Sequence, residues 1–147
     1  MIKSTMTAEK ALAGFGNVDC GQAVFGEFAP QLGVDRDTAL KIAGYFGGGM
    51  WVGETCGAVV GALMAIGLKY GVVEDGDPDK KADFFAKCAE FREKFAAKYG
   101  SCICKDMLGY NIPEDMEKIM EENKFGNVCC HAVVDACEIC AEILNRE

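Results

Sequence analysis

The sequence is poor in features that mark several common classes of protein. Its single histidine, His131, leaves little scope for Cys–His or Ser–His–Asp catalysis, since both need an imidazole base. The longest apolar run covers about 13 residues, 56 to 68, and is too short to span a bilayer. The N-terminal region also lacks the apolar run of a secretory signal, so we expect a cytoplasmic protein.

Positive charge is scarce as well. The 15 Lys and Arg residues are outnumbered by 23 Asp and Glu residues, which leaves a formal net charge of −8 at pH 7. An acidic surface repels nucleic acids and anionic membranes, so we expect neither as a partner. Small molecules and basic patches on other proteins remain compatible with this charge.

Strand signals are missing, because no pair of segments has the composition of a β-hairpin. Helical spacing and capping residues instead indicate helices over residues 7–14, 20–32, from Asp35 or Asp37 to the glycine run 47–49, 55–70, 79–99, 114–124 and 127–145, with a turn or short helix over 101–109. We therefore expect an all-α fold, a compact bundle of five or six helices that forms a single domain over residues 1–147.

Apolar residues at helical spacing indicate which parts of the helices are buried. One stripe has the spacing i, i+4, i+7 and i+11 and consists of Phe84, Cys88, Phe91 and Phe95. Cys88 in this stripe is interpreted as a small hydrophobic residue of the core. In the last helix, core packing is sufficient to explain Cys137, and Cys140 follows it at i+3.

The sequence is rich in cysteine, with nine residues. The cytosol keeps thiols reduced, so this number favours metal binding or redox chemistry over a framework of structural disulfides. Cys56 lies near the start of the helix predicted over 55–70, where the helix terminus stabilises a thiolate. We therefore expect a lowered pKa at Cys56, although a buried structural cysteine is an equally consistent interpretation.

Other cysteines are candidates for the same chemistry: Cys20, Cys102, Cys104, Cys129 and Cys130. Cys20 opens the second predicted helix, while Cys102 and Cys104 flank one residue in a turn, where two thiols can bind one metal ion or exchange with one disulfide. The adjacent pair Cys129 and Cys130 rarely closes on itself, because the ring is strained. Such a pair usually points in two directions.

Glycine surrounds Cys56 on both sides. The run 47–49 precedes it, and Gly53, Gly57, Gly61 and Ala65 are spaced by four, which gives a smooth face for another helix or a cofactor. The segment lacks the Lys-Ser/Thr pair of a phosphate-binding P-loop. An acidic loop, residues 74–79, does not match a calcium-binding EF-hand and is interpreted as solvated.

The cysteine pattern resembles that of the redox-active protein family named for its C-GCAxxG-C-C motif. The core of the motif is similar to Cys56-Gly57-Ala58-Val59-Val60-Gly61, and the other three family cysteines correspond to Cys20, Cys104 and Cys130. The resemblance covers residues 17–144 and implies redox activity. Five cysteines are additional to the pattern, namely Cys88, Cys102, Cys129, Cys137 and Cys140. They leave open which of Cys129 and Cys130 is the active one.

Two functions follow from this resemblance. In the favoured hypothesis, Cys20, Cys56, Cys104 and Cys130 bind an iron–sulfur cluster, with Cys102 and Cys129 as further possible ligands, and the protein transfers or stores electrons. In the alternative, no metal is bound and Cys56 is the reactive thiol of a thiol–disulfide oxidoreductase or redox sensor. We expect a redox partner protein, and a homodimer is compatible with the glycine-rich face.

Overall fold

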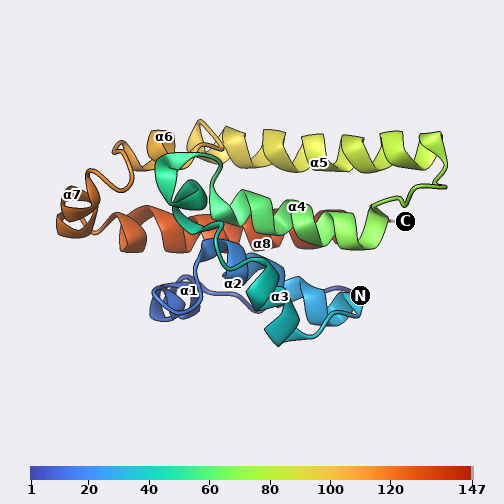
Figure 1. Cartoon of the computed structure of the whole chain (residues 1–147), viewed down its shortest axis with the longest axis horizontal. Coiled ribbons are helices and arrows are strands. Elements are labelled where there is room, and N and C mark those ends of the chain that lie inside the picture. Colours follow the sequence, from blue (N-terminus) through green and yellow to red (C-terminus); the bar gives the residue numbers. More distant parts are fainter. Residues whose placement is uncertain (147) are drawn as a thin grey trace.

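The chain is helical over most of its length (Figure 1). The computed structural model describes residues 1–146, which contain no strand beyond one isolated bridge. The α-helices are α1 (Ala8–Gly14), α2 (Cys20–Phe28), α3 (Arg36–Ile42), α4 (Gly57–Tyr70), α5 (Pro78–Tyr99), α6 (Cys104–Leu108), α7 (Met116–Glu121) and α8 (Cys130–Leu144). A 3₁₀-helix, η1 (Ala29–Leu32), continues α2, and η2 (Gly49–Gly53) and η3 (Phe125–Cys129) are π-type turns. The all-α prediction is confirmed.

The helices are more numerous than the five or six that the sequence indicated. Within residues 1–146 the eight α-helices include four short ones, α1, α3, α6 and α7, which have 7, 7, 5 and 6 residues. Helices of this length are unstable in isolation and depend on tertiary contacts. Periodicity in the sequence does not report those contacts, so it underestimates the number of helices.

Side-chain caps account for several helix starts. The Thr7 side chain accepts a hydrogen bond from the Lys10 N–H at 3.1 Å, and Asp35 accepts one from the Thr38 N–H at 3.0 Å. Asp19 forms the predicted cap of α2, where the Gln22 side chain accepts a hydrogen bond from the Asp19 N–H at 2.9 Å. Each contact satisfies a donor that the first turn of a helix leaves free.

The segment between α3 and α4 differs from the prediction. Helix α3 ends at Ile42 and does not reach the glycine run, so residues 43–56 form a long connection. Helix α4 starts at Gly57 and not near Thr55, because Thr55 pairs with Ile103 in an antiparallel bridge. The predicted helix 114–124 is likewise shortened to α7.

Helix α4 lies in the middle of the bundle, against α2, α5 and α8 (Figure 1). The backbones of α2 and α4 approach closely, because a Cβ atom at Gly61 would lie 2.5 Å from the Gly21 carbonyl oxygen. The small-residue face predicted on α4 is therefore, at this position, the contact with α2. This approach requires glycine at position 61, and a Cβ atom at Gly21 would also be tight, 3.1 Å from the Gly57 carbonyl oxygen.

The buried stripe of α5 is confirmed in its C-terminal half. Phe91 and Phe95 are fully buried and their rings stack at a centroid distance of 6.0 Å, whereas Phe84 and Cys88 are only partly buried. Cys137 is buried in the core, as its apolar stripe indicated, and Cys140 is buried there as well. The core therefore centres on α2, α4, α8 and the second half of α5.

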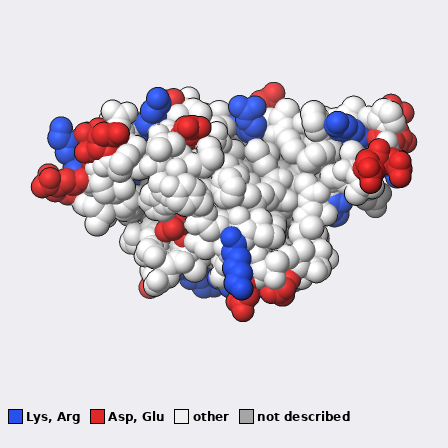
Figure 2. Space-filling model, viewed as in Figure 1, with Lys and Arg blue, Asp and Glu red and all other residues white. Residues whose placement is uncertain are grey.

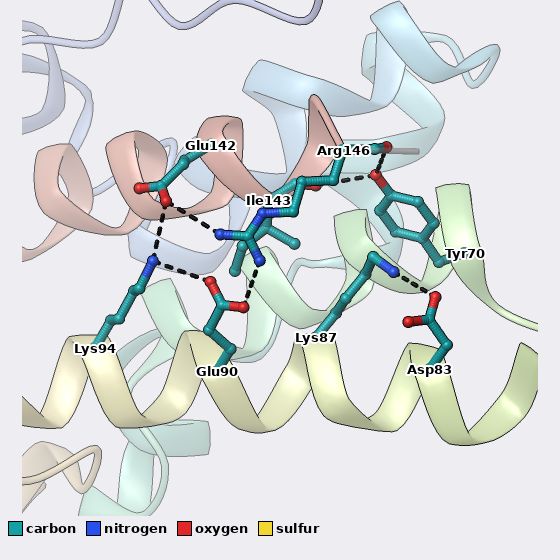
Figure 3. Close-up of polar contacts among 8 residues, drawn as sticks. All are labelled: Tyr70, Asp83, Lys87, Glu90, Lys94, Glu142, Ile143 and Arg146. Atoms are coloured by element: carbon teal, nitrogen blue, oxygen red, sulfur yellow. Dashed lines mark hydrogen bonds and ion pairs between the residues drawn. The ribbon is translucent and has the colours of Figure 1, made fainter.

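A polar network joins the end of α4, α5 and the end of α8 (Figure 3). Its charged members are the pair Asp83 and Lys87, which lies beside Tyr70, and the group Glu90, Lys94, Glu142 and Arg146. Lys94 lies 2.9 Å from Glu90 and 3.0 Å from Glu142, and Arg146 pairs with the same two carboxylates. The Tyr70 hydroxyl lies 2.9 Å from the Ile143 carbonyl oxygen, to which it donates. These contacts tie the end of α8 to α4 and α5.

Charge on the face shown in Figure 2 lies mainly at its edges and two ends, with a wide uncharged area over α4. The acidic loop of residues 74–79 is exposed, in agreement with the prediction of a solvated loop. Among residues 1–146, no helix combines the length and the apolar character needed to cross a membrane.

Candidate functional site

A short backbone bridge joins two cysteine-bearing segments. The Cys104 N–H donates to the Glu54 carbonyl oxygen at 2.6 Å, and the Cys56 N–H donates to the Cys102 carbonyl oxygen at 2.8 Å. These two bonds flank the antiparallel pair of Thr55 and Ile103. They hold the start of α4 beside the start of α6, although the two segments are almost 50 residues apart in the sequence.

A cavity of about 200 Å³ lies next to this bridge. Four cysteines contribute to its wall, namely Cys20, Cys56, Cys104 and Cys129. The remaining wall is mostly apolar and consists of Phe15, Gly16, Asp19, Gly48, Trp51, Met107, Leu108, Met116, Phe125 and Ala132. We call this cavity the sulfur pocket.

The structure places the two adjacent cysteines of the last segment differently. Cys129 lines the sulfur pocket and is half-buried, whereas Cys130 belongs to the main core and is 2% exposed. The Cys130 thiol donates to the Gly126 carbonyl oxygen at 3.1 Å, within its own helical turn. Three of the four cysteines that the family resemblance identified therefore line one pocket, namely Cys20, Cys56 and Cys104. The fourth cysteine of the pocket is Cys129, the neighbour of Cys130.

Cys20 and Cys56 interact directly across the pocket. The hydrogen bond with Cys56 lowers the pKa of Cys20 to about 7, assisted by the backbone N–H groups of Gly48 and Gly21, while burial and Asp19 act in the opposite direction. The same hydrogen bond and burial raise the pKa of Cys56 well above its ordinary value. The predicted lowering at Cys56 is therefore wrong, because the helix terminus does not outweigh burial and the neighbouring thiol.

The pKa values of the other two pocket thiols are raised as well. Burial, and next the charge of Cys20, raise the pKa of Cys104 to about 12. Burial also raises the pKa of Cys129, with contributions from Cys20, Cys104 and Cys130. These mutual effects indicate that the sulfurs lie close enough for a charge on one to disfavour a charge on the next.

Glycine gives the Cys20 sulfur its space. A Cβ atom at Gly57 would lie 2.6 Å from the Cys20 sulfur and 2.6 Å from the Phe46 carbonyl oxygen. Both distances are far below a normal contact, so the family-type Cys-Gly pair at 56–57 has a steric reason. The glycine lets the first turn of α4 reach the sulfur of α2.

A sequence model of the family described as "Putative redox-active protein (C_GCAxxG_C_C)" matches residues 18–143. The chain belongs to this family. No curated protein and no solved structure matches the chain. The predicted membership is thus confirmed over residues 18–143.

The C-GCAxxG-C-C family pattern explains the pocket only in part. The aromatic wall, formed by Phe15, Trp51 and Phe125, was not identified from the sequence. The glycine run 47–49 was a usable signal, since it indicated a close backbone approach at this point. Because the approaching groups come from distant segments, their identity was not readable from local spacing.

The remaining cysteines of this C-GCAxxG-C-C protein lie outside the sulfur pocket. Cys102 is half-buried, and its thiol lies 3.6 Å from the Arg92 carbonyl oxygen. The Cys140 thiol lies 3.7 Å from the Ala62 carbonyl oxygen in the core. Cys88 is half-buried on α5, and His131 is exposed. These positions agree with the structural interpretation of Cys88 and Cys137, and Cys140 is buried in the same core.

Among residues 1–146, no group of three or more His, Cys, Asp or Glu side chains is arranged to hold one metal ion. The four pocket cysteines instead stand around a cavity. A single ion needs its ligands within about 2–2.5 Å of one point, and this arrangement does not provide that. An occupant that spans the cavity is a better match for these sulfurs.

Proposed function

We propose that this redox-active protein binds an iron–sulfur cluster in the sulfur pocket and serves in electron transfer or storage. The observation that carries the proposal is the convergence of Cys20, Cys56, Cys104 and Cys129 on one cavity of about 200 Å³. Four cysteine thiolates are the usual ligand set of such clusters. Bound there, a cluster supplies one-electron chemistry that the side chains lack.

The donor set fits this group. The four cysteines come from four separate segments of the chain and line one cavity, and four cysteine thiolates are the ligand set of many iron–sulfur clusters. The space for the Cys20 sulfur exists only because residue 57 is glycine. We assign the fourth ligand position to Cys129, since Cys130 is directed into its own turn.

Backbone donors offset the charge that four thiolates bring together. The backbone N–H groups of Gly21 and Gly48 lower the pKa of Cys20, and that of Ala58 acts in the same direction on Cys56. Among the 14 wall residues, all within the described range 1–146, no Lys, Arg or His occurs. The protein therefore stabilises negative charge through N–H dipoles and an apolar wall that limits access of water.

The test is the iron and sulfide content of protein purified without oxygen. We expect brown protein with iron and acid-labile sulfide, bleached by dithionite. The Cys104→Ser variant should lose most of the iron, whereas the matched Cys88→Ser variant should retain it, because Cys88 lies outside the pocket. Colourless wild-type protein after reconstitution with iron and sulfide would contradict the proposal.

The fourth ligand is tested by a second matched pair. Cys129→Ser should weaken cluster binding more than Cys130→Ser, which removes only a hydrogen bond within a helical turn. The measurement is iron content after a fixed time with a chelator. The opposite order would assign the ligand to Cys130, in line with the family pattern.

A second candidate is thiol–disulfide exchange, which the contact between Cys20 and Cys56 favours. Here the half-buried Cys20 thiolate attacks a disulfide, releases one thiolate and forms a mixed disulfide. The Cys56 sulfur then attacks Cys20, which releases the second thiol and leaves a Cys20–Cys56 disulfide. Two thiols are oxidised as one substrate disulfide is reduced.

Oxidised glutathione tests this alternative on reduced, metal-free protein. Mass spectrometry should find a Cys20–Cys56 disulfide, and Cys56→Ser should trap glutathione on Cys20. The pKa of Cys20, about 7, predicts that its reaction rate rises as pH increases through that value. A disulfide at other cysteines, with Cys20 unmodified, would exclude this route.

A further inference from the structure

The backbone beside the sulfur pocket is strained. Four consecutive residues have left-handed conformations, with φ of +58° at Gly48, +64° at Gly49, +58° at Met50 and +60° at Trp51. Residues other than glycine visit this region singly and at an energetic cost. Strain of this kind persists only where the surrounding structure enforces it, and it commonly marks a functional segment.

In this turn the indole of Trp51 packs against the backbone of two glycines. A Cβ atom at Gly48 would lie 2.7 Å from the Trp51 ring, and one at Gly47 would lie 3.1 Å from it. Any side chain at these positions would push the ring away. The ring forms part of the wall of the sulfur pocket and is half-buried, so one side faces the cavity region and part of it remains accessible.

The same turn borders the pocket thiols. Gly48 lines the sulfur pocket together with Trp51 and Cys20, so the residue that supports the indole also lies at the cavity of a pocket thiol. The turn then leads through Glu54, whose N–H donates to the Gly49 carbonyl oxygen at 3.0 Å. Glu54 in turn accepts from Cys104, which connects the turn to a second pocket cysteine.

We propose that Trp51 closes the sulfur pocket against dissolved reagents, and that Gly47 and Gly48 hold it in the closing position. The inference rests on the proposed function in one respect, namely that the pocket cysteines carry the redox chemistry. Trp51 is thus a shielding and positioning residue. Removing the indole opens the path to Cys20, while a smaller aromatic ring in its place retains most of the cover.

The first experiment measures the alkylation rate of each cysteine in reduced, metal-free protein with iodoacetamide, followed by mass spectrometry. Trp51→Ala should accelerate the modification of Cys20 by about tenfold. Trp51→Phe should remain near the wild-type rate, and Cys88 should react equally in all variants. Equal Cys20 rates in wild type and Trp51→Ala would overturn the proposal.

A second pair of variants displaces the indole without deleting it. Gly48→Ala introduces a Cβ atom 2.7 Å from the ring, whereas Gly100→Ala introduces one with no atom within 4 Å. Both glycines have positive φ, +58° and +77°, so the backbone strain is similar. Gly48→Ala should expose Cys20 to alkylation and Gly100→Ala should not. Equal Cys20 alkylation rates in the two variants would contradict the proposal that Gly48 positions the Trp51 indole.

The unaltered chain gives an independent readout, because Trp51 is its only tryptophan. Reconstitution with iron and sulfide should quench the Trp51 fluorescence if the cluster binds against the indole. Iron uptake without quenching would place the cluster outside the sulfur pocket and contradict the proposed function, while the alkylation rates still decide the role of Trp51. Failure to take up iron would contradict the proposed function alone, since the alkylation test of Trp51 needs no metal.

Discussion

At its first turn, helix α4 is held by backbone and glycine contacts, whereas its last turn is held by side chains. Around Cys56 and Gly57, carbonyl oxygens and thiols of other segments approach the helix directly. Around Lys69 and Tyr70, donors on long side chains reach the carbonyl groups at the end of α8. One helix therefore connects an end with few charged side chains, Asp19 among them, to an end with several ion pairs.

The difference has a physical consequence for the sulfurs. The ion pairs of Glu90, Lys94, Glu142 and Arg146 lie toward the Tyr70 end of α4, where water screens them. The wall of the sulfur pocket contains a single carboxylate, Asp19, among the described residues 1–146. Charge on a pocket thiol is thus governed by nearby N–H groups and by the other thiols.

The largest expected contrast comes from two glycines of α4. Gly57→Ala places a Cβ atom 2.6 Å from the Cys20 sulfur, and we expect a loss of about 1–3 kcal/mol in the free energy of unfolding. At Gly67 the nearest atom would be 3.6 Å away, so Gly67→Ala should stabilise by about 0.5–1 kcal/mol. Denaturant unfolding measures both changes. Equal effects would show that the two ends of α4 are packed alike.

Removing one hydroxyl tests the polar end. In Tyr70→Phe the ring remains but the bond to the Ile143 carbonyl is lost, and we expect a loss of about 0.5–1.5 kcal/mol. Iron binding should not change, because Tyr70 lies at the other end of α4. Denaturant unfolding and iron content give the two readouts. A variant that loses iron would show that the two ends are energetically coupled.

In the strained turn beside the sulfur pocket, one substitution is expected to stabilise the protein. Met50→Gly removes the cost of a left-handed conformation at a non-glycine residue, and we expect a gain of about 0.5–1 kcal/mol in stability. Asn123→Gly is the control, since asparagine tolerates its positive φ of +51° with little cost. Thermal unfolding compares the two. A destabilised Met50→Gly variant would mean that the side-chain contacts of Met50 outweigh the strain.

The smallest expected effect concerns the ion pairs. Hydrogen bonds from Arg146 and Lys94 lower the pKa of Glu90 from 4.5 to about 2. A lowered carboxyl pKa stabilises the fold above the ordinary value, and this contribution is lost as pH falls from about 4.5 toward 2. Wild type should therefore lose up to about 1 kcal/mol more than Glu90→Gln across this range. Parallel stability curves from acid titrations would exclude the contribution.

Several features of the fold were readable from the sequence because they have local causes. The caps Thr7, Asp19 and Asp35 start the predicted helices, since each cap contacts a backbone group within three residues. The stop at Gly100 has the same local origin, a left-handed residue that ends α5. By contrast, the early end of α3 and the late start of α4 follow from distant contacts such as the Thr55–Ile103 bridge.

The candidate site likewise has some properties that the local sequence reveals and others that depend on distant segments. The motif around Cys56 identifies the family and the chemistry of thiols, and it names Cys20 and Cys104 as companions. The pKa of Cys56, in contrast, is set by burial and by the Cys20 thiol, neither of which local spacing reveals. The choice between adjacent residues at 129 and 130 depends on the rotation of the last helical segment relative to the pocket.

The sequence by itself determined the helical class of this protein, its family and the kind of atom at its site, because periodicity, caps and cysteine identity are properties of short segments. Only the tertiary structure decided that Cys129 faces the pocket, that Cys20 has the lowered pKa and that Trp51 forms part of the wall. These properties depend on distances between segments that chain folding brings together. Distance, burial and the direction of N–H groups govern the energy of a thiolate, and none of them is encoded locally.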